Sequence, residues 1–326
     1  MLRAIAPSNS LAERVTATLP RVAQVFESQL SSELAAVNEL CRHVERYRGK
    51  MLRPMLVLAG GGVGGAPSCT TSHVVLAAVV EMIHMATLVH DDVLDEAEVR
   101  RGGRTLNSLR GNEAAVMLGD YLISNAFHLC ASVGDSSLNQ ALGEVTNRLC
   151  QGELLQLSLR GETSLDEATY FDIIDRKTAS LTGACCALGA RLSGVESSTQ
   201  QAMESFGRAL GVAFQIQDDL LDLLGEERTV GKSVGRDLAK GKLTLPVVLH
   251  LRQASTESVA RAMAAIRGAD IKALGAEVRA SGAAGRAAAQ AEVQVRRAKE
   301  AIAVLPHDEA RDLLISLADA TINRSS

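Results

Sequence analysis

Two short acidic segments carry the residues most able to do chemistry. Each contains three aspartates in the order Asp-Asp-x-x-Asp and each follows an apolar run: they are Asp91/Asp92/Asp95 and Asp218/Asp219/Asp222. Residues four apart lie on one face of a helix, so Asp91 and Asp95 would hold two carboxylates one turn apart. At about 6 Å, two such charges repel by roughly 3 kcal/mol at an effective dielectric of about 20. A divalent cation would relieve this repulsion.

The type of ligand suggests which cation binds. Oxygen ligands without histidine or cysteine favour magnesium over zinc, and Mg²⁺ usually shares its coordination shell with water and substrate phosphates. A single acidic pair could equally form a solvent-exposed helix face. The second copy, and the basic, glycine-containing segment after each copy, favour a site in which Mg²⁺ holds a diphosphate ester between the two clusters.

Basic residues near the acidic segments fit this interpretation, because the remaining phosphate oxygens need cationic partners. Arg100-Arg101-Gly102 follows the first cluster, and the second is followed by Lys232, Arg236, Lys240 and Lys242. Farther upstream, Lys50 and Arg53 are predicted to lie on adjacent turns of one helix face as a second anion site. His84, two turns before Asp91, is predicted to face the same way, although a lone histidine in an apolar helix is more often a core residue.

Helices are the elements expected to position these residues. The chain contains 6 prolines and none between Pro67 and Pro246, and apolar residues recur at helical spacing. No strand-rich block and no linker divides the sequence. We therefore predict an all-α bundle of roughly ten or more helices around a central cavity, forming one domain over residues 1–326, with residues 1–20 as a partly ordered N-terminal segment.

Composition excludes several classes of protein. The chain has 326 residues, is 47% hydrophobic and carries a net charge of −4, which gives no basic footprint for nucleic acid. Its 6 cysteines lack Cys-x-x-Cys spacing, which indicates reduced thiols and a cytoplasmic location. The most apolar stretch, residues 75–89, is interrupted by Glu81 and His84, so we predict a buried core helix and no transmembrane segment.

Together these motifs resemble the trans-polyprenyl diphosphate synthases, all-helical enzymes that elongate isoprenyl chains. The resemblance extends from about Gly49 to His250. It rests on Gly49-Lys50-x-x-Arg53-Pro54, His84, Asp91-Asp92-x-x-Asp95, Arg100-Arg101-Gly102, Gly119-Asp120, Gly152-Glu153-x-x-Gln156, Lys177-Thr178-Ala179, Phe214-Gln215-x-Gln217-Asp218-Asp219-x-x-Asp222, Gly231-Lys232 through Asp237, and Gly241-Lys242-x-Thr244-Leu245-Pro246.

The resemblance implies a role for each group of residues. Magnesium on the allylic diphosphate would be held by Asp91, Asp95 and Asp218. The same diphosphate would be bound by Arg100, Lys177, Gln215, Lys232 and Lys242. Isopentenyl diphosphate would be bound by Lys50, Arg53, His84 and Arg101. Neighbours of the carbocation would be Lys177, Thr178 and Gln215, and Asp92, Asp219 and Asp222 complete the catalytic set. A homodimer is also implied, with the apolar helix around residues 119–129 as its candidate interface.

The resemblance also predicts the product. Ala86 and Thr87, five and four residues before Asp91, are small where short-chain enzymes often have an aromatic plug, so we expect a long polyprenyl diphosphate of the kind used for quinone tails. The alternatives are a short-chain farnesyl or geranylgeranyl synthase and a catalytically silent regulatory subunit. Aromatic residues at 2% disfavour a terpene cyclase. The intact isopentenyl-type site at Lys50, Arg53 and His84 disfavours a head-to-head enzyme.

Overall fold

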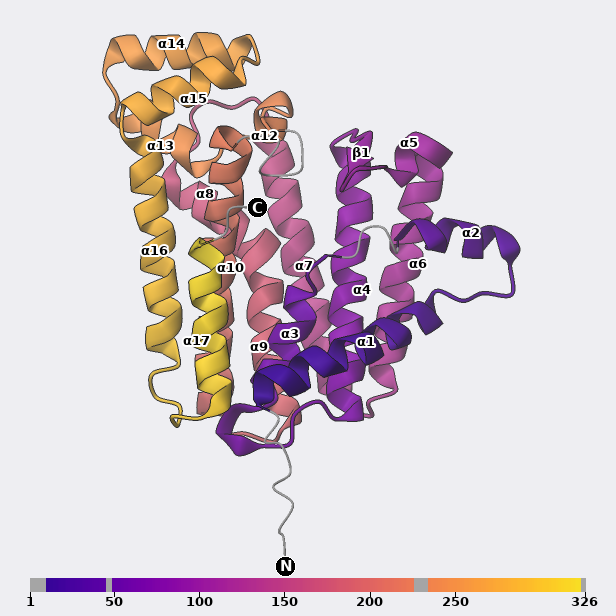
Figure 1. Ribbon diagram of the computed structural model, residues 1–326. Helices are drawn as coiled ribbons and strands as arrows, with labels where there is room; N and C mark the ends of the chain where they lie inside the picture. Colours follow the sequence, from indigo (N-terminus) through magenta and orange to yellow (C-terminus); the bar gives the residue numbers. More distant parts are fainter. Residues whose placement is uncertain (1–9, 45–48, 226–233, 324–326) are drawn as a thin grey trace, which may run out of the picture.

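The chain folds as a bundle of helices (Figure 1). The structure, a computed structural model, describes residues 10–44, 49–225 and 234–323. Within these ranges the only strands are β1 (Val99–Arg100) and β2 (Gly103–Arg104), which pair as an antiparallel hairpin. The predicted all-α fold is confirmed.

The helices vary widely in length. In the first half of the chain they are α1 (Leu11–Gln29), α2 (Ala35–Val44), α3 (Leu52–Gly60), the 3-10 turn η2 (Val63–Gly65), α4 (Thr71–Leu94), α5 (Leu106–Arg110), α6 (Asn112–Ala131) and α7 (Ser136–Ser158). In the second half they are α8 (Glu167–Ile174), the π-helical turn η3 (Asp175–Ala179), α9 (Ser180–Leu192), α10 (Ser197–Leu224), α12 (Arg236–Ala239), α13 (Leu245–Gln253), α14 (Thr256–Arg267), α15 (Ile271–Ala280), α16 (Ala283–Ala301) and α17 (Glu309–Ile322).

The N-terminal segment becomes helical early. Ser10 and Glu13 form a reciprocal capping box that satisfies two backbone N–H groups at the start of α1. Residues 11–20 therefore belong to a helix whose apolar side is buried, with Leu11 and Val15 almost fully enclosed. Residues 1–9 lie outside the described part of the chain.

Helix α4 lies in the main core and carries the first acidic segment at its C-terminal end. Its side chains are apolar around most of its circumference, as expected for a helix enclosed by others, and it packs against α1, α3, α6 and α9. By length and composition alone, α4 and α6 could each cross a membrane. The most apolar part of α4 is 72% buried inside the protein, in agreement with the predicted core helix, whereas the corresponding part of α6 is 39% buried.

Helix α10 carries the second acidic segment, also near its C-terminal end. It packs along α9 and α16, and α9 in turn packs against both α4 and α3. Figure 1 shows α16 and α17 on one side of α10 and α4, α5 and α6 on the other. The two acidic segments are therefore held at the ends of two long helices that are connected through α9.

Candidate active site

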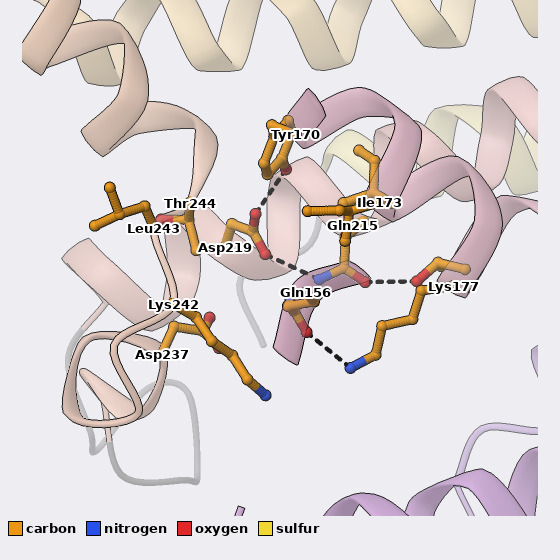
Figure 2. A pocket seen from close by; sticks show the side chains of 12 residues that line it. Gln156, Tyr170, Ile173, Lys177, Gln215, Asp219, Asp237, Lys242, Leu243 and Thr244 are labelled. Carbon is orange, nitrogen blue, oxygen red and sulfur yellow. Dashed lines mark hydrogen bonds between the residues drawn. The ribbon is translucent and has the colours of Figure 1, made fainter. Parts of the chain in front are cut away.

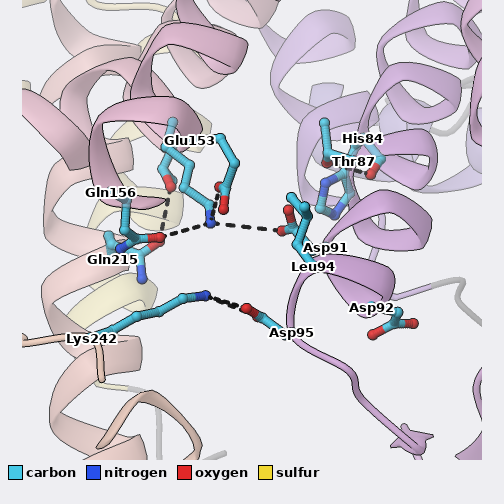
Figure 3. A network of polar contacts seen from close by, with 12 residues as sticks. His84, Thr87, Asp91, Asp92, Leu94, Asp95, Glu153, Gln156, Gln215 and Lys242 are labelled. Carbon is cyan, nitrogen blue, oxygen red and sulfur yellow. Dashed lines mark hydrogen bonds and ion pairs between the residues drawn. The ribbon is translucent and has the colours of Figure 1, made fainter. Parts of the chain in front are cut away.

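The first acidic segment occupies the C-terminal end of α4, with Asp95 as its C-cap. The side chains of Asp91 and Asp95 are 22% and 20% exposed, and Figure 3 shows both directed toward the segments that carry Gln156 and Lys242. A helix C-terminus already carries partial negative charge, so two carboxylates there destabilise one another and the helix end. Cations must approach this position for the arrangement to be stable.

Asp92 has a different environment, because it is buried within the protein. Its side chain is 1% exposed, and its Oδ1 accepts a hydrogen bond from Arg100 Nε at 2.8 Å and forms an ion pair with Arg100 Nη2 at 2.8 Å. The Asn107 amide donates to the backbone carbonyl of Asp92 at 3.1 Å. Asp92 therefore fixes the hairpin after α4 in place, and the Arg100 expected on the allylic diphosphate pairs with this buried carboxylate.

The hairpin determines where Arg101 lies. Its two central residues, Arg101 and Gly102, have φ values of 50° and 74°, and positive φ at both positions is what a type I′ turn requires. This turn places Arg101 at the tip of the hairpin. A Cβ atom on Gly49 would lie 2.7 Å from a terminal nitrogen of the Arg101 guanidinium, so the guanidinium occupies space that only glycine leaves at position 49.

The second acidic segment repeats this division of roles. Asp218 is half-buried, whereas Asp219 is 3% exposed and accepts hydrogen bonds from the Tyr170 hydroxyl at 2.6 Å and the Gln215 amide at 2.9 Å. The Gln215 carbonyl oxygen in turn accepts from the Thr178 hydroxyl at 2.9 Å. Figure 2 shows Tyr170, Asp219 and Gln215 joined in one chain of hydrogen bonds along the wall of a pocket. Asp219 therefore holds α8, η3 and α10 together.

Asp222 contacts the start of α12. Its carboxylate accepts from the backbone N–H groups of Arg236 at 3.3 Å and Asp237 at 3.1 Å, and its backbone carbonyl accepts from Gly235 at 2.8 Å. The carboxylate is 9% exposed. Asp222 thereby links the end of α10 to the start of α12. Three of the six aspartates remain half-buried, and they are the three expected to hold magnesium: Asp91, Asp95 and Asp218.

Lys177 extends from η3 between the two sides of the site. Its ammonium forms an ion pair with Glu153, donates to Gln156 at 3.1 Å and lies 3.9 Å from the Asp91 carboxylate. Burial lowers the pKa of Lys177, but Asp91 and Glu153 raise it by more, so its pKa lies above the ordinary value. The π-helical geometry of η3, a feature often found at functional sites, widens one turn at this position.

Lys242 reaches Asp95 from the segment before α13. Its ammonium contacts both carboxylate oxygens, at 2.8 and 2.9 Å, as Figure 3 shows. Burial raises the pKa of Asp95, but Lys242, Lys177 and Arg160 together lower it below the ordinary value. Burial also raises the pKa of Asp91, and the charge of the nearby Lys177 offsets this only in part, so the pKa lies above its ordinary value. Asp95 is thus the more firmly ionised of the two.

A cavity of about 70 Å³ lies beside these groups. Its lining includes Lys177, Thr178, Gln215, Asp219 and Lys242. Asp237 also lines it, and burial followed by the charge of Asp222 raises the pKa of Asp237 to about 6. Among the described residues, no group of three or more His, Cys, Asp or Glu side chains is close enough to hold a metal ion unaided. The carboxylates supply the hard oxygen ligands that Mg²⁺ prefers, and substrate phosphates and water would have to complete its shell.

A second group of cations surrounds His84. Burial lowers the pKa of His84 well below its ordinary value, and the guanidiniums of Arg53, Arg101 and Arg100 lower it further. Burial also lowers the pKa of Arg53, while Glu81 and Asp218 oppose this effect. Arg100 pairs with the buried Asp92, and the negative charges of Glu81 and Asp218 act on Arg53. Arg53 and Arg101 are the guanidiniums of this group that could bind an anion.

Two predicted anion-binding lysines, Lys50 and Lys232, do not lie in described helices of the site. Lys50 and Arg53 do not share a helix: α3 begins at Leu52, because Met51 has left-handed φ and ψ of 55° and 36° and caps the helix. Lys50 therefore lies in the segment before α3 and is exposed, so the prediction of one helix face was wrong. Lys232, expected on the allylic diphosphate, lies outside the described residues.

The two residues expected to set product length lie on α4, about one turn before Asp91. Ala86 is fully buried, and Thr87 is half-buried with its hydroxyl donating to the His84 carbonyl at 2.7 Å. Figure 3 shows Thr87 close to His84 and Asp91. Both side chains are small, as expected for a long product.

Sequence reasoning gave no role to several residues of this site, among them Glu153, Gln156, Asp237, Tyr170 and Arg160. Glu153 and Asp237 belong to motifs that were noted, and the spacing of Glu153 and Gln156 on α7 was a signal that both face the same partner. Tyr170 and Arg160 lie 49 and 65 residues from their aspartates, Asp219 and Asp95. Contacts of this kind depend on the fold and leave no local pattern.

Comparison with known proteins gives a consistent result. The polyprenyl synthetase family model matches residues 35–278. An octaprenyl diphosphate synthase of Escherichia coli K12 is 35% identical over 301 residues, covering 91% of this chain and 92% of the relative. A short chain isoprenyl diphosphate synthase of Methanothermobacter thermautotrophicus is 36% identical over 290 residues, covering 86% of this chain and 88% of the relative.

A solved structure agrees closely with the fold. The polyprenyl synthase of Caulobacter crescentus CB15, crystallised with calcium and isoprenyl diphosphate, superposes with a TM-score of 0.91 at 31% identity, and the match covers 98% of this chain and 100% of that one. A divalent cation and an isoprenyl diphosphate thus occur together in a protein of this architecture.

Proposed function

Because the chain belongs to the polyprenyl synthetase family, we propose that it is a magnesium-dependent prenyltransferase that condenses isopentenyl diphosphate head-to-tail onto an allylic diphosphate such as farnesyl diphosphate. The product would be a long-chain all-trans polyprenyl diphosphate. Membership of the family supports the prenyltransferase class. The substrates, the metal and the chain length are parts of the proposal.

One observation carries the assignment to a diphosphate. Asp91 and Asp95 meet Lys177 and Lys242 between α4 and the opposite wall, with Lys242 2.8 Å from Asp95 and Lys177 3.9 Å from Asp91. Carboxylates paired with ammonium groups around a cavity provide both kinds of partner that a metal-bound diphosphate needs. The oxygens of an incoming diphosphate would bind the ammonium groups of Lys177 and Lys242. The carboxylates of Asp91 and Asp95 would then be available to bind the metal.

The residues then divide the reaction among them. Asp91, Asp95 and Asp218 would hold Mg²⁺, which when bound supplies positive charge to stabilise the departing diphosphate. Lys177 and Lys242 would bind the diphosphate oxygens on which negative charge develops as the allylic C–O bond breaks. Thr178 and Gln215 line the same cavity and would face the carbocation with oxygen atoms.

The second substrate would bind at the cations around His84. The diphosphate of isopentenyl diphosphate would be held by Lys50, Arg53, His84 and Arg101, with its double bond directed toward the cation. Attack by the double bond forms the new C–C bond, and loss of a proton restores neutrality. We assign that proton to the released diphosphate, because the groups on the protein that face the cavity serve to bind the metal or the substrates.

Incorporation of radiolabelled isopentenyl diphosphate tests this function directly. With farnesyl diphosphate and Mg²⁺ we expect labelled polyprenyl product, and removal of Mg²⁺ with a chelator should abolish it. Asp91→Asn should lose activity by about a hundredfold to a thousandfold, the scale seen when a group that stabilises charge in a transition state is removed. Asp172→Asn on the exposed face of α8 is the matched control. No incorporation with any allylic primer would favour the silent-subunit alternative.

The product length is the finer part of the proposal. The small residues Ala86 and Thr87 support elongation beyond the geranylgeranyl stage, and several relatives of this chain are octaprenyl, heptaprenyl and nonaprenyl synthases. A short-chain product is the alternative to be tested, because one relative at 36% identity is a short chain isoprenyl diphosphate synthase. Chromatography of dephosphorylated products separates the two, and a product that stops at geranylgeranyl would refute the long-chain assignment.

We further propose that two copies of the chain associate through α6 and that the enzyme acts in the cytoplasm, in a pathway to a quinone side chain. Met117 is 64% exposed and Val116 40% exposed, just before the predicted interface at residues 119–129. Analytical ultracentrifugation should show a dimer that Met117→Glu weakens, whereas a monomeric unaltered chain would exclude this interface.

The proposed cytoplasmic location is supported by the cysteines. All six are unpaired in the structure, as is usual for proteins of reducing compartments.

A further inference from the structure

Arg160, in the connection after α7, contacts the end of the helix that carries the first acidic segment. Both of its terminal nitrogens donate to the Leu94 backbone carbonyl at 3.2 Å, and Nη2 also donates to Asp95 Oδ1 at 2.8 Å. The guanidinium thus satisfies a carbonyl in the last turn of α4 and places positive charge where the helix dipole favours it. It also orients the side chain of Asp95.

The residue after Arg160 fixes the same connection to the opposite wall. The Gly161 N–H donates to the Gly241 carbonyl at 3.0 Å, next to Lys242. Gly161 and Gly241 have φ values of 78° and 67°, and a Cβ atom on Gly241 would lie 3.1 Å from the Gly161 nitrogen. The connection after α7 therefore links the end of α4 with the segment that carries Lys242. The position of Asp95 and the position of Lys242 depend on one another through Arg160 and Gly161.

Lys242 and Arg160 contact different sets of oxygen atoms on the Asp95 carboxylate. Lys242 contacts both carboxylate oxygens and so occupies the side from which a metal ion would approach. Arg160 contacts only Oδ1 and has an independent anchor on the Leu94 carbonyl. When Lys242 moves onto a diphosphate, Arg160 can keep its contacts while Oδ2 of Asp95 turns to the metal. The contact between Arg160 and Asp95 can therefore be kept when diphosphate and metal bind, whereas the contact of Lys242 with both oxygens must break.

We propose that Arg160 is a positioning residue that presents Asp95 to the metal–diphosphate complex. This inference rests on the proposed function, because it assigns Asp95 to the metal. It predicts that loss of Arg160 weakens the metal only when diphosphate is bound with it, and raises KM for the allylic substrate. KM for isopentenyl diphosphate should change little, because that site is formed by Arg53, His84 and Arg101.

Binding of Mn²⁺ to the full-length protein, measured by electron paramagnetic resonance with and without inorganic diphosphate, gives a readout separate from activity. In Arg160→Gln we expect diphosphate-dependent Mn²⁺ binding to weaken about tenfold, equivalent to roughly 1.4 kcal/mol. Arg160→Lys should recover part of the loss, since it keeps the charge but not the forked geometry. Arg252→Gln is the matched control, because Arg252 donates to the Ser164 carbonyl in the same connection at 3.2 Å.

The possible results separate the two levels of the proposal. If the unaltered chain neither binds Mn²⁺ with diphosphate nor forms product, the proposed function fails and this inference fails with it. If the unaltered chain does both and Arg160→Gln matches it within twofold, the inference alone is overturned. Equal increases in both KM values with a lower Tm would also overturn it, because they indicate a general loss of structure. Should Arg160→Gln not fold, Arg160→Lys must still show a weaker diphosphate-dependent affinity for the inference to stand.

Discussion

Removal of the Tyr170 hydroxyl offers a sharp test of how the second acidic segment is held. The Tyr170 hydroxyl donates a 2.6 Å hydrogen bond to Asp219, which is only 3% exposed. Water therefore cannot readily replace this donor when the hydroxyl is removed. Hydrogen bonds to charged groups contribute about 1.5–3 kcal/mol, and a buried partner left unsatisfied adds to the cost. In Tyr170→Phe, Gln215 remains as the second donor at 2.9 Å, so we expect the lower part of that range, about 1.5–2 kcal/mol.

Urea denaturation followed by circular dichroism, in the presence of a chelator, measures this free energy of unfolding without a contribution from metal binding. Ser316→Ala on α17 is the control, because it removes an exposed hydroxyl that donates to the Asp312 carbonyl within the same helix. We expect a change of less than about 0.5 kcal/mol there, as for most substitutions away from buried networks. An equal loss in both variants, or no loss in Tyr170→Phe, would refute the argument that Asp219 anchors α8 to α10.

Three further predictions concern separate parts of the molecule. Arg53→Gln should raise KM for isopentenyl diphosphate by at least about tenfold, the loss of one charged hydrogen bond, and leave KM for the allylic substrate unchanged in steady-state assays. Thr87→Phe should shorten the main product seen by chromatography, whereas Thr87→Val should not. Arg261 and Ser258 lower the pKa of Glu277 from 4.5 to about 2, so Glu277 stabilises the fold above pH 4.5 and this contribution disappears as the pH falls to about 2. Glu277→Gln should therefore lower Tm at pH 7 but not at pH 2, and equal effects at both would contradict this assignment.

The helices and the two acidic segments could be predicted because their signals are local. The scarcity of proline and the helical spacing of apolar residues determine that the long segments are helices, and four-residue spacing places Asp91 and Asp95 on one face. Family membership, predicted from the order of the motifs, is confirmed by the comparisons. The roles assigned to individual site residues stay predictions until variants are measured.

What could not be predicted depends on contacts between distant segments and on unusual backbone geometry. Asp91 and Asp92 are adjacent in sequence, and the charge of the buried Asp92 is balanced by Arg100 from the hairpin that follows α4, a contact with no local signal. The helix expected to carry Lys50 starts two residues later because Met51 has a positive φ, which non-glycine residues rarely adopt. Arg160 lies in an irregular connection, where no periodicity relates it to Asp95.

The two acidic segments balance their charge in different ways. Asp92 and Asp95 pair with the cations of Arg100, Arg160 and Lys242. In the described part of the chain, the hydrogen bonds to the buried Asp219 come instead from the neutral side chains of Tyr170 and Gln215.

This difference appears in the acidity of the groups. The pKa of Asp95 lies below its ordinary value, because its cationic neighbours outweigh burial. The pKa of Asp219 lies well above its ordinary value, through burial and then the charge of Asp237, and the pKa of Asp237 itself is raised to about 6. Burial likewise raises the pKa of Asp91 on the α4 side, so each acidic segment includes a carboxylate whose burial outweighs its stabilising partners. A divalent cation gains electrostatic energy beside such carboxylates, so we expect metal bound with diphosphate to stabilise the ends of both α4 and α10.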